Sequence, residues 1–130
     1  MSHIEENASR AIKDIFETIS NEEGIEIKGY FASDVVKVNG KSCVYPCFVG
    51  FTTTSIVLVK INEQLEREEI SHITSSKLKA IKIKKGFLSR FLKLRIDCTD
   101  HSSFVAGVPE KLKYIEVQQK NIEKFVELFS

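Results

Sequence analysis

Residues 77–98 hold most of the side chains that could do chemistry, because basic and apolar residues alternate there in two runs. The first run covers residues 77–85 and the second covers 92–98. Side chains alternate between the two faces of a strand, so this period-two pattern predicts two strands, each with one apolar and one basic face. The basic face carries Lys82, Lys84, Lys93 and Arg95. Like charges on one sheet face repel, so this cluster either has acidic neighbours or binds an anion.

Both alternatives stay open at the level of sequence. A phosphate-like anion suits the cluster, because lysines supply point charges and Arg95 offers a planar fork for two oxygens. The other alternative is a solvated face neutralised by Asp97 and by acids of a neighbouring strand, which is the commoner case because exposed charge costs little. The candidate ligands for an anion or a lipid headgroup are Lys82, Lys84, Lys85, Arg90, Lys93 and Arg95.

An apolar loop joins the two runs. It contains Phe87, Leu88 and Phe91, with basic residues on both sides. Such a tip would combine insertion into a bilayer with attraction to anionic lipid. Apolar loops more commonly fold under the sheet rim or form a subunit contact, so we expect self-association ahead of lipid binding.

Two other kinds of chemistry are weakly indicated. Residues 85–91 match an RNA-binding signature only in part, and a net charge of +1 supplies little attraction to phosphate, so we expect no nucleic acid partner. Cys98 and His101 have metal-ligand spacing that Cys43 and Cys47 could complete for zinc, but Cys98 continues an inward register and is expected to be a buried thiol. We therefore expect no metal and no cofactor.

Catalysis is not indicated either. The chain has no nucleophile motif, no glycine-rich phosphate loop and no paired carboxylates, and His72 is most simply a surface or edge residue. We expect no enzymatic activity.

Composition sets the class of protein. The 130 residues fit one domain, and 42% hydrophobic with 28% charged residues is typical of a soluble globular chain. The longest apolar run, residues 56–59, is far too short to span a membrane. Three cysteines fit reduced thiols, so we expect a cytoplasmic protein with at most peripheral membrane contact.

Two helices flank the β-rich part of the chain. Apolar residues at three- and four-residue spacing predict an amphipathic helix over residues 3–20, packed on its own domain or on a partner subunit, and a second helix over 119–129. Between them, residues 25–118 read as strands, with Asn39 and Gly40 as a tight hairpin turn. The expected strands are 25–31, 35–38, 41–45, 47–52, 56–61, 70–73, 77–85, 92–98, 103–107 and 112–118. The run 56–61 is apolar enough to be covered on both faces and to form the centre of the core.

This pattern resembles the pleckstrin-homology (PH) superfold, and in detail the small bacterial PH-like domains. The resemblance rests on residues 48–60, 69–73 and 121–129, and it covers residues 25–129. It implies a binding platform without enzymatic activity. In phosphoinositide-binding members, a lysine and a later basic-x-Arg triplet hold the ligand; Lys84 or Lys85 with Lys93 and Arg95 has that outline, later in the chain than is usual.

The sequence therefore predicts a single domain over residues 1–130. It is a mainly β, PH-like antiparallel barrel or bent sheet of about seven strands, with a capping C-terminal helix and an added N-terminal helix. The expected function is a protein-interaction or self-assembly module, a homo-oligomer that uses the N-terminal helix stripe, an open sheet edge or the 87–91 tip. The alternative is peripheral binding of anionic lipid or phosphate through residues 77–98.

Overall fold

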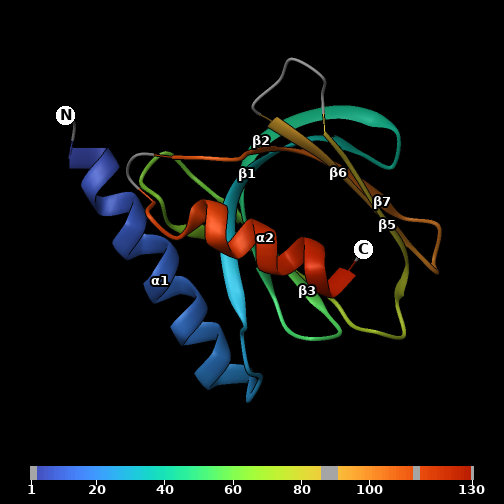
Figure 1. Ribbon diagram of the computed structural model, residues 1–130, viewed down its shortest axis with the longest axis horizontal. Helices are drawn as coiled ribbons and strands as arrows, with labels where there is room; N and C mark the ends of the chain where they lie inside the picture. Colours follow the sequence, from blue (N-terminus) through green and yellow to red (C-terminus); the bar gives the residue numbers. More distant parts are fainter. Residues whose placement is uncertain (1–2, 86–90, 113–114, 130) are drawn as a thin grey trace.

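The computed structural model describes residues 3–85, 91–112 and 115–129 (Figure 1). Two helices flank seven strands in the chain order, α1 His3–Glu23, β1 Gly29–Val38, β2 Lys41–Phe51, β3 Ile56–Ile61, β4 Arg67–Ile73, β5 Leu78–Lys85, β6 Phe91–Cys98, β7 Ser103–Pro109 and α2 Gln118–Phe129. This confirms the predicted class, a mainly β domain with one helix at each end.

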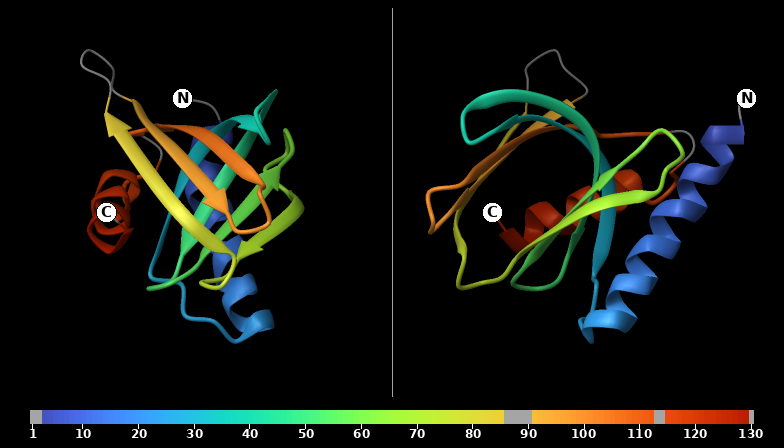
Figure 2. Two further views of the ribbon diagram at one scale, coloured as in Figure 1. Left: turned by 90° about the vertical axis from the view of Figure 1, so that its right-hand side faces the viewer. Right: turned by 180° about the vertical axis from the view of Figure 1, so that it is seen from behind.

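All seven strands belong to one sheet in the order β4-β3-β2-β1-β7-β6-β5. Every neighbouring pair is antiparallel, and in the described part of the sheet β4 and β5 are its two edges. Figure 2 shows that the sheet is strongly bent, with α2 across its opening and α1 along its outer side. We call the surface that faces α2 the inner face, and the opposite surface the outer face.

Several predicted element boundaries were wrong. The expected strands 25–31 and 35–38 are one strand, β1, with a bulge between Val35 and Lys37. The expected strands 41–45 and 47–52 also join, through Pro46, into β2. Proline is tolerated there because β3 pairs with β2 only from Cys47 onward.

The predicted strand 112–118 is also wrong. The described residues there form only an isolated bridge between Leu112 and Ile115, and α2 already begins at Gln118. The side chain of Ile115 is buried, so the apolar alternation of this segment reflects core packing rather than a strand.

Strand β3 is buried on both faces, as predicted. Ile56 and Leu58 belong to the inner core beneath α2, whereas Val57 and Val59 pack with the residues of α1. Because side chains alternate along a strand, one short apolar strand serves two layers of core. Strand β3 therefore contributes to both hydrophobic clusters.

The apolar stripe of α1 packs on its own domain. Ile12, Phe16 and Ile19 are buried among outer-face residues of β2 and β3. Phe16 also stacks on Tyr30, with ring centroids 5.5 Å apart. The expectation that this stripe serves as an open contact surface is therefore wrong for its described residues, because the domain itself covers them.

Helix α2 covers a part of β1 that β7 does not reach. Strand β7 pairs with β1 only from Asp34 to Val38, which leaves the first half of β1 without a strand partner on that side. Side chains of α2 fill this place, with Gln118 bonded to Ala32 N and O at 2.8 Å, Asn121 donating to Tyr30 O at 2.9 Å and Lys124 donating to Lys28 O at 3.1 Å. The helix thus satisfies backbone groups at alternate residues that would otherwise form an open sheet edge.

Candidate functional site

Strands β5 and β6 bring the predicted cations together on the outer face of the sheet. Their antiparallel register sets Lys82 opposite Arg95 and Lys84 opposite Lys93. Residues directly opposite in an antiparallel pair have Cβ atoms about 5 Å apart, so each pair places two positive charges side by side. We call these four residues, Lys82, Lys84, Lys93 and Arg95, the basic face.

The basic face is only partly neutralised. Arg95 Nε lies 3.0 Å from a carboxylate oxygen of Asp97, as the solvated-face alternative expects. Among the described residues, no carboxylate lies within ion-pairing distance of Lys82, Lys84 or Lys93. All four cations are exposed. Because three charges stay unmatched, this arrangement can attract an anion from solution.

Lys85 stands apart from the basic face. It lies opposite Leu92, which puts it in the inward register of the hairpin, and its Nζ is 3.2 Å from Glu110 Oε1. Of the remaining predicted residues, Phe87, Leu88 and Arg90 lie outside the described part of the chain.

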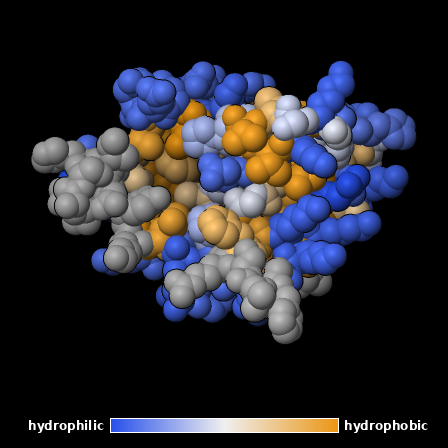
Figure 3. All heavy atoms as spheres, turned by 90° about the horizontal axis from the view of Figure 1, so that it is seen from above, coloured by the Kyte–Doolittle hydropathy of each residue, from blue (hydrophilic) through white to orange (hydrophobic). Residues whose placement is uncertain are grey.

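Phe91 shares the outer face with the cations. It precedes Lys93 and Arg95 at period two on β6, lies opposite Pro109, and is 52% exposed. Figure 3 shows hydrophilic side chains gathered toward the end of the molecule that holds β5, β6 and β7 in Figure 1, beside a central band of hydrophobic residues. The face therefore combines unmatched positive charge with exposed apolar surface.

Sequence reasoning missed Lys37. The register places it in line with Val105, Arg95 and Lys82 across four strands, and its side chain is exposed. Only the pairing of β1 with β7 reveals this neighbour, and no local pattern encodes that pairing.

A shallow open groove also borders the cations, and its lining includes Lys82, Arg95, His101 and Ser102.

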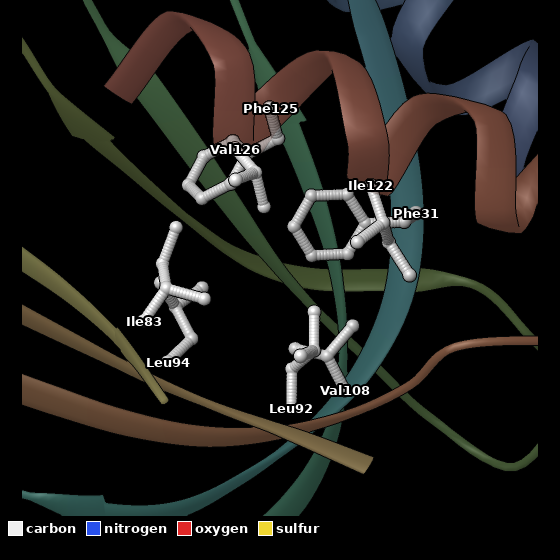
Figure 4. Close-up of a pocket in the computed structure, with 8 residues that line it drawn as sticks. All are labelled: Phe31, Ile83, Leu92, Leu94, Val108, Ile122, Phe125 and Val126. Atoms are coloured by element: carbon white, nitrogen blue, oxygen red, sulfur yellow. The ribbon is translucent and has the colours of Figure 1, made fainter. Parts of the chain in front are cut away.

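The core beneath α2 has no room for a ligand. Its void measures about 10 Å³, roughly the space of one water molecule. Figure 4 shows the aliphatic and phenyl side chains that line it, which are those of Phe31, Ile83, Leu92, Leu94, Val108, Ile122, Phe125 and Val126. A void of this size, lined without polar groups, offers no place for a ligand beneath α2.

A second polar cluster joins the end of α1 to the sheet. His72 on β4 lies 3.4 Å from Ser55 Oγ and 3.6 Å from a carboxylate oxygen of Glu23, and Arg67 pairs with Glu22 at 3.2 Å. The order serine, histidine, carboxylate is that of a nucleophilic triad. However, Ser55 is 7% exposed and shares a 2.7 Å hydrogen bond with Thr52. We therefore interpret the cluster as a structural contact that holds the end of α1 against the sheet.

All three cysteines are free thiols. Cys43 is exposed, whereas Cys47 and Cys98 are buried in the inner core, which confirms the predicted inward register of Cys98. Burial raises the pKa of the Cys47 thiol to about 12. The described residues hold no group of three or more His, Cys, Asp or Glu side chains that could bind a metal ion.

Comparison with known proteins yields a fold relationship. No family model matches the chain, and no curated protein matches it either. A solved structure that is similar is the hSac2 domain from human phosphoinositide phosphatase Sac2, with a TM-score of 0.56 at 12% identity. The match covers 98% of this chain and 80% of that one. At this identity the likeness shows the fold alone.

In the described residues, neither helix is long and apolar enough to cross a membrane.

Proposed function

We propose that this chain is a non-enzymatic binding module whose basic face recognises an anionic lipid surface. The observation that carries the proposal is the arrangement of the basic face. Its cations on β5 lie opposite those on β6, and Lys82, Lys84 and Lys93 lack a carboxylate partner among the described residues. Repulsion between opposed like charges falls when an anion lies over them, so binding gains energy that a neutralised face would not offer.

The charge distribution supports the same proposal. Residues 77–98 contain eight basic residues and one acid, Asp97, a net charge of +7 in a chain whose formal net charge is +1. Each Lys or Arg near an anionic bilayer contributes about 1 kcal/mol, so three or four cations give a weak, reversible attraction. Exposed Phe91 on the same face favours a bilayer over a free anion, because an aromatic ring gains from contact with the interfacial region.

Relationships with other proteins add modest support. The strand order with a C-terminal helix fits the PH-like resemblance, a class of binding platforms. The similar solved domain comes from a phosphoinositide phosphatase, which makes phosphorylated lipid a natural probe. The sequence favoured self-association through the N-terminal helix stripe, an open sheet edge or the 87–91 tip. The helix stripe is not available for this contact, because α1 packs on its own sheet.

Co-sedimentation with vesicles tests the proposal. The compositions are pure phosphatidylcholine, phosphatidylcholine with phosphatidylserine, and phosphatidylcholine with a phosphoinositide, each at low and high salt. We expect capture by both anionic compositions at low salt and release at high salt, because salt screens exposed charges. Equal capture by the neutral and the anionic vesicles would overturn the proposal.

A parallel arm separates a lipid surface from a free phosphate site. Inorganic phosphate is titrated into the protein alone and into the vesicle-bound protein. A lipid surface predicts that phosphate displaces the protein no better than chloride does at the same ionic strength. Saturable phosphate binding that displaces the protein from vesicles would replace the lipid surface by a phosphate site.

A further inference from the structure

The two edges of the sheet are exposed and carry opposite charge. Strand β4 has β3 on one side, and β5 has β6 on one side, with no further strand on either in the described sheet. Residues 67–70 of β4 are all exposed, and so are Lys79, Lys82, Lys84 and Lys85 of β5. Both edges therefore present backbone groups that another strand can reach.

The charge on β4 is acidic. Glu68 and Glu69 lie on the strand, and Glu63 and Glu66 lie in the turn before it. Arg67 is already matched by Glu22 of α1 at 3.2 Å, so it does little to neutralise its neighbours. Among the described residues, no cation lies within ion-pairing distance of Glu68 or Glu69.

The signs of these charges decide which edges can meet. Pairing β4 with the β4 of another copy would set glutamates against glutamates, and pairing two β5 strands would set lysines against lysines. Like charges on facing strands are destabilising, so both symmetric pairings are disfavoured. Pairing β4 with β5 of another copy can instead bring Glu68 and Glu69 near the lysines of β5.

We infer that a second copy of this chain docks head to tail, its β5 edge extending the sheet at β4. This goes beyond lipid recognition, because it uses the edge of β5 and all of β4 rather than the basic face as a whole. The contact joins two different surfaces, so each added copy leaves one free β4 and one free β5. Assembly therefore yields open chains or rings whose mass grows with protein concentration.

Two charge-reversed variants test this inference by light scattering. E68K/E69K has two basic edges, and K79E/K82E/K84E, whose β5 then carries three glutamates and Lys85, has two acidic edges. We expect wild-type mass to rise with concentration at low salt and to fall to that of a monomer at high salt. Each variant alone should remain monomeric, and an equimolar mixture of the two should regain association, since each then meets a complementary edge.

Circular dichroism of both variants checks that they are folded before mixing. A wild-type protein that stays monomeric at low salt and high concentration would overturn the inference. So would a folded pair of variants that remains monomeric after mixing, or wild-type association that persists at high salt. Lys93 lies on β6, one strand in from the β5 edge, and does not belong to either edge strand, so K93Q should associate like wild type even though its vesicle binding is reduced. This variant separates failure of the assembly from failure of lipid recognition.

Discussion

The lysines of the β5–β6 hairpin differ in role because of a single step in register. Lys84 and Lys93 point outward as an opposed pair, whereas the adjacent Lys85 follows the inward register and pairs with Glu110. Sequence alternation predicted the opposed cations correctly. It did not assign Lys85 to the other face, because two consecutive lysines at the end of a run fit either register.

A matched pair of substitutions tests this assignment. We expect K93Q to weaken co-sedimentation with phosphatidylserine vesicles about fivefold, corresponding to one lysine at about 1 kcal/mol. K85Q makes the same change in charge but should bind within twofold of wild type, because Lys85 lies on the other face. Equal losses in the two variants would show that net charge, rather than the basic face, governs binding.

Cys47 makes stability depend on alkaline pH. Burial raises its pKa from 9.0 to about 12 in the folded state. Between these values the unfolded chain loses the thiol proton while the folded chain keeps it, so the free energy of unfolding falls as pH rises. The slope from this thiol approaches about 1.4 kcal/mol per pH unit.

Urea unfolding of wild type, C47A and C43A from pH 8 to 11 measures that slope. This range extends from about one unit below to about two units above the thiol pKa of the unfolded chain. C47A should show a shallower fall in stability above pH 9, and C43A, at an exposed position, controls for the removal of a thiol. Identical slopes for wild type and C47A would contradict a buried, neutral Cys47 thiol.

Among the elements, the two helices were the most predictable and their attachments the least. Their apolar spacing is local, so it identified both from sequence. The pairing of β1 with β7 joins residues some seventy positions apart in the chain, such as Asp34 with Gly107, and no periodicity specifies it. For the same reason Lys37 and the polar contacts of α2 with β1 could not be predicted.

The docking of α1 depends on a glycine in β2. A Cβ on Gly50 would meet the ring of Phe16, with one ring carbon at 2.6 Å and another at 2.9 Å. We expect G50A to destabilise the fold by roughly 1–3 kcal/mol through overpacking. Gly107 provides the control, because a Cβ there meets nothing within 4 Å.

Chemical denaturation of both variants measures the effect. In a double-mutant cycle, G50A should cost less in an F16A background, because the clash with the ring is then absent. An unchanged cost of G50A in that background would contradict this contact.

Gln118 holds α2 against the sheet. Its side chain is fully buried and bonds Ala32 N and O, and it donates to Pro109 O at 2.9 Å. Q118A leaves these backbone groups without partners, so we expect a loss of about 2–3 kcal/mol in the free energy of unfolding. Gln119, which is exposed, gives a matched control. A loss in Q118A no larger than that in Q119A would refute this role.

The whole molecule is electrostatically polar although its net charge is only +1. Residues 77–98 carry +7, so the rest of the chain carries −6, and glutamates gather on and before β4 at the opposite edge of the sheet. Composition alone suggested a nearly neutral surface with little attraction to anions. The fold separates the charges, because the strand order places the basic hairpin at one edge and the acidic strand at the other.

In the function that we propose, this polarity orients the molecule at an anionic surface. The basic hairpin is attracted and the acidic edge is repelled, so the outer face of β5 and β6 turns toward the bilayer. The acidic edge then points away from it and stays accessible to another copy. Lipid recognition and head-to-tail assembly therefore share Lys82 and Lys84 of β5, whereas only assembly uses β4.

The most direct test of lipid recognition is a two-dimensional amide NMR titration of the wild-type protein with anionic bicelles, with neutral bicelles as reference. Our proposal predicts that the amide resonances of Lys82, Lys84, Phe91 and Lys93 shift and broaden with anionic bicelles only. The amide resonances of α1 should be unperturbed. Perturbations that centre on α1 or β4, or that are the same with neutral bicelles, would contradict the assignment of the basic face as the binding surface.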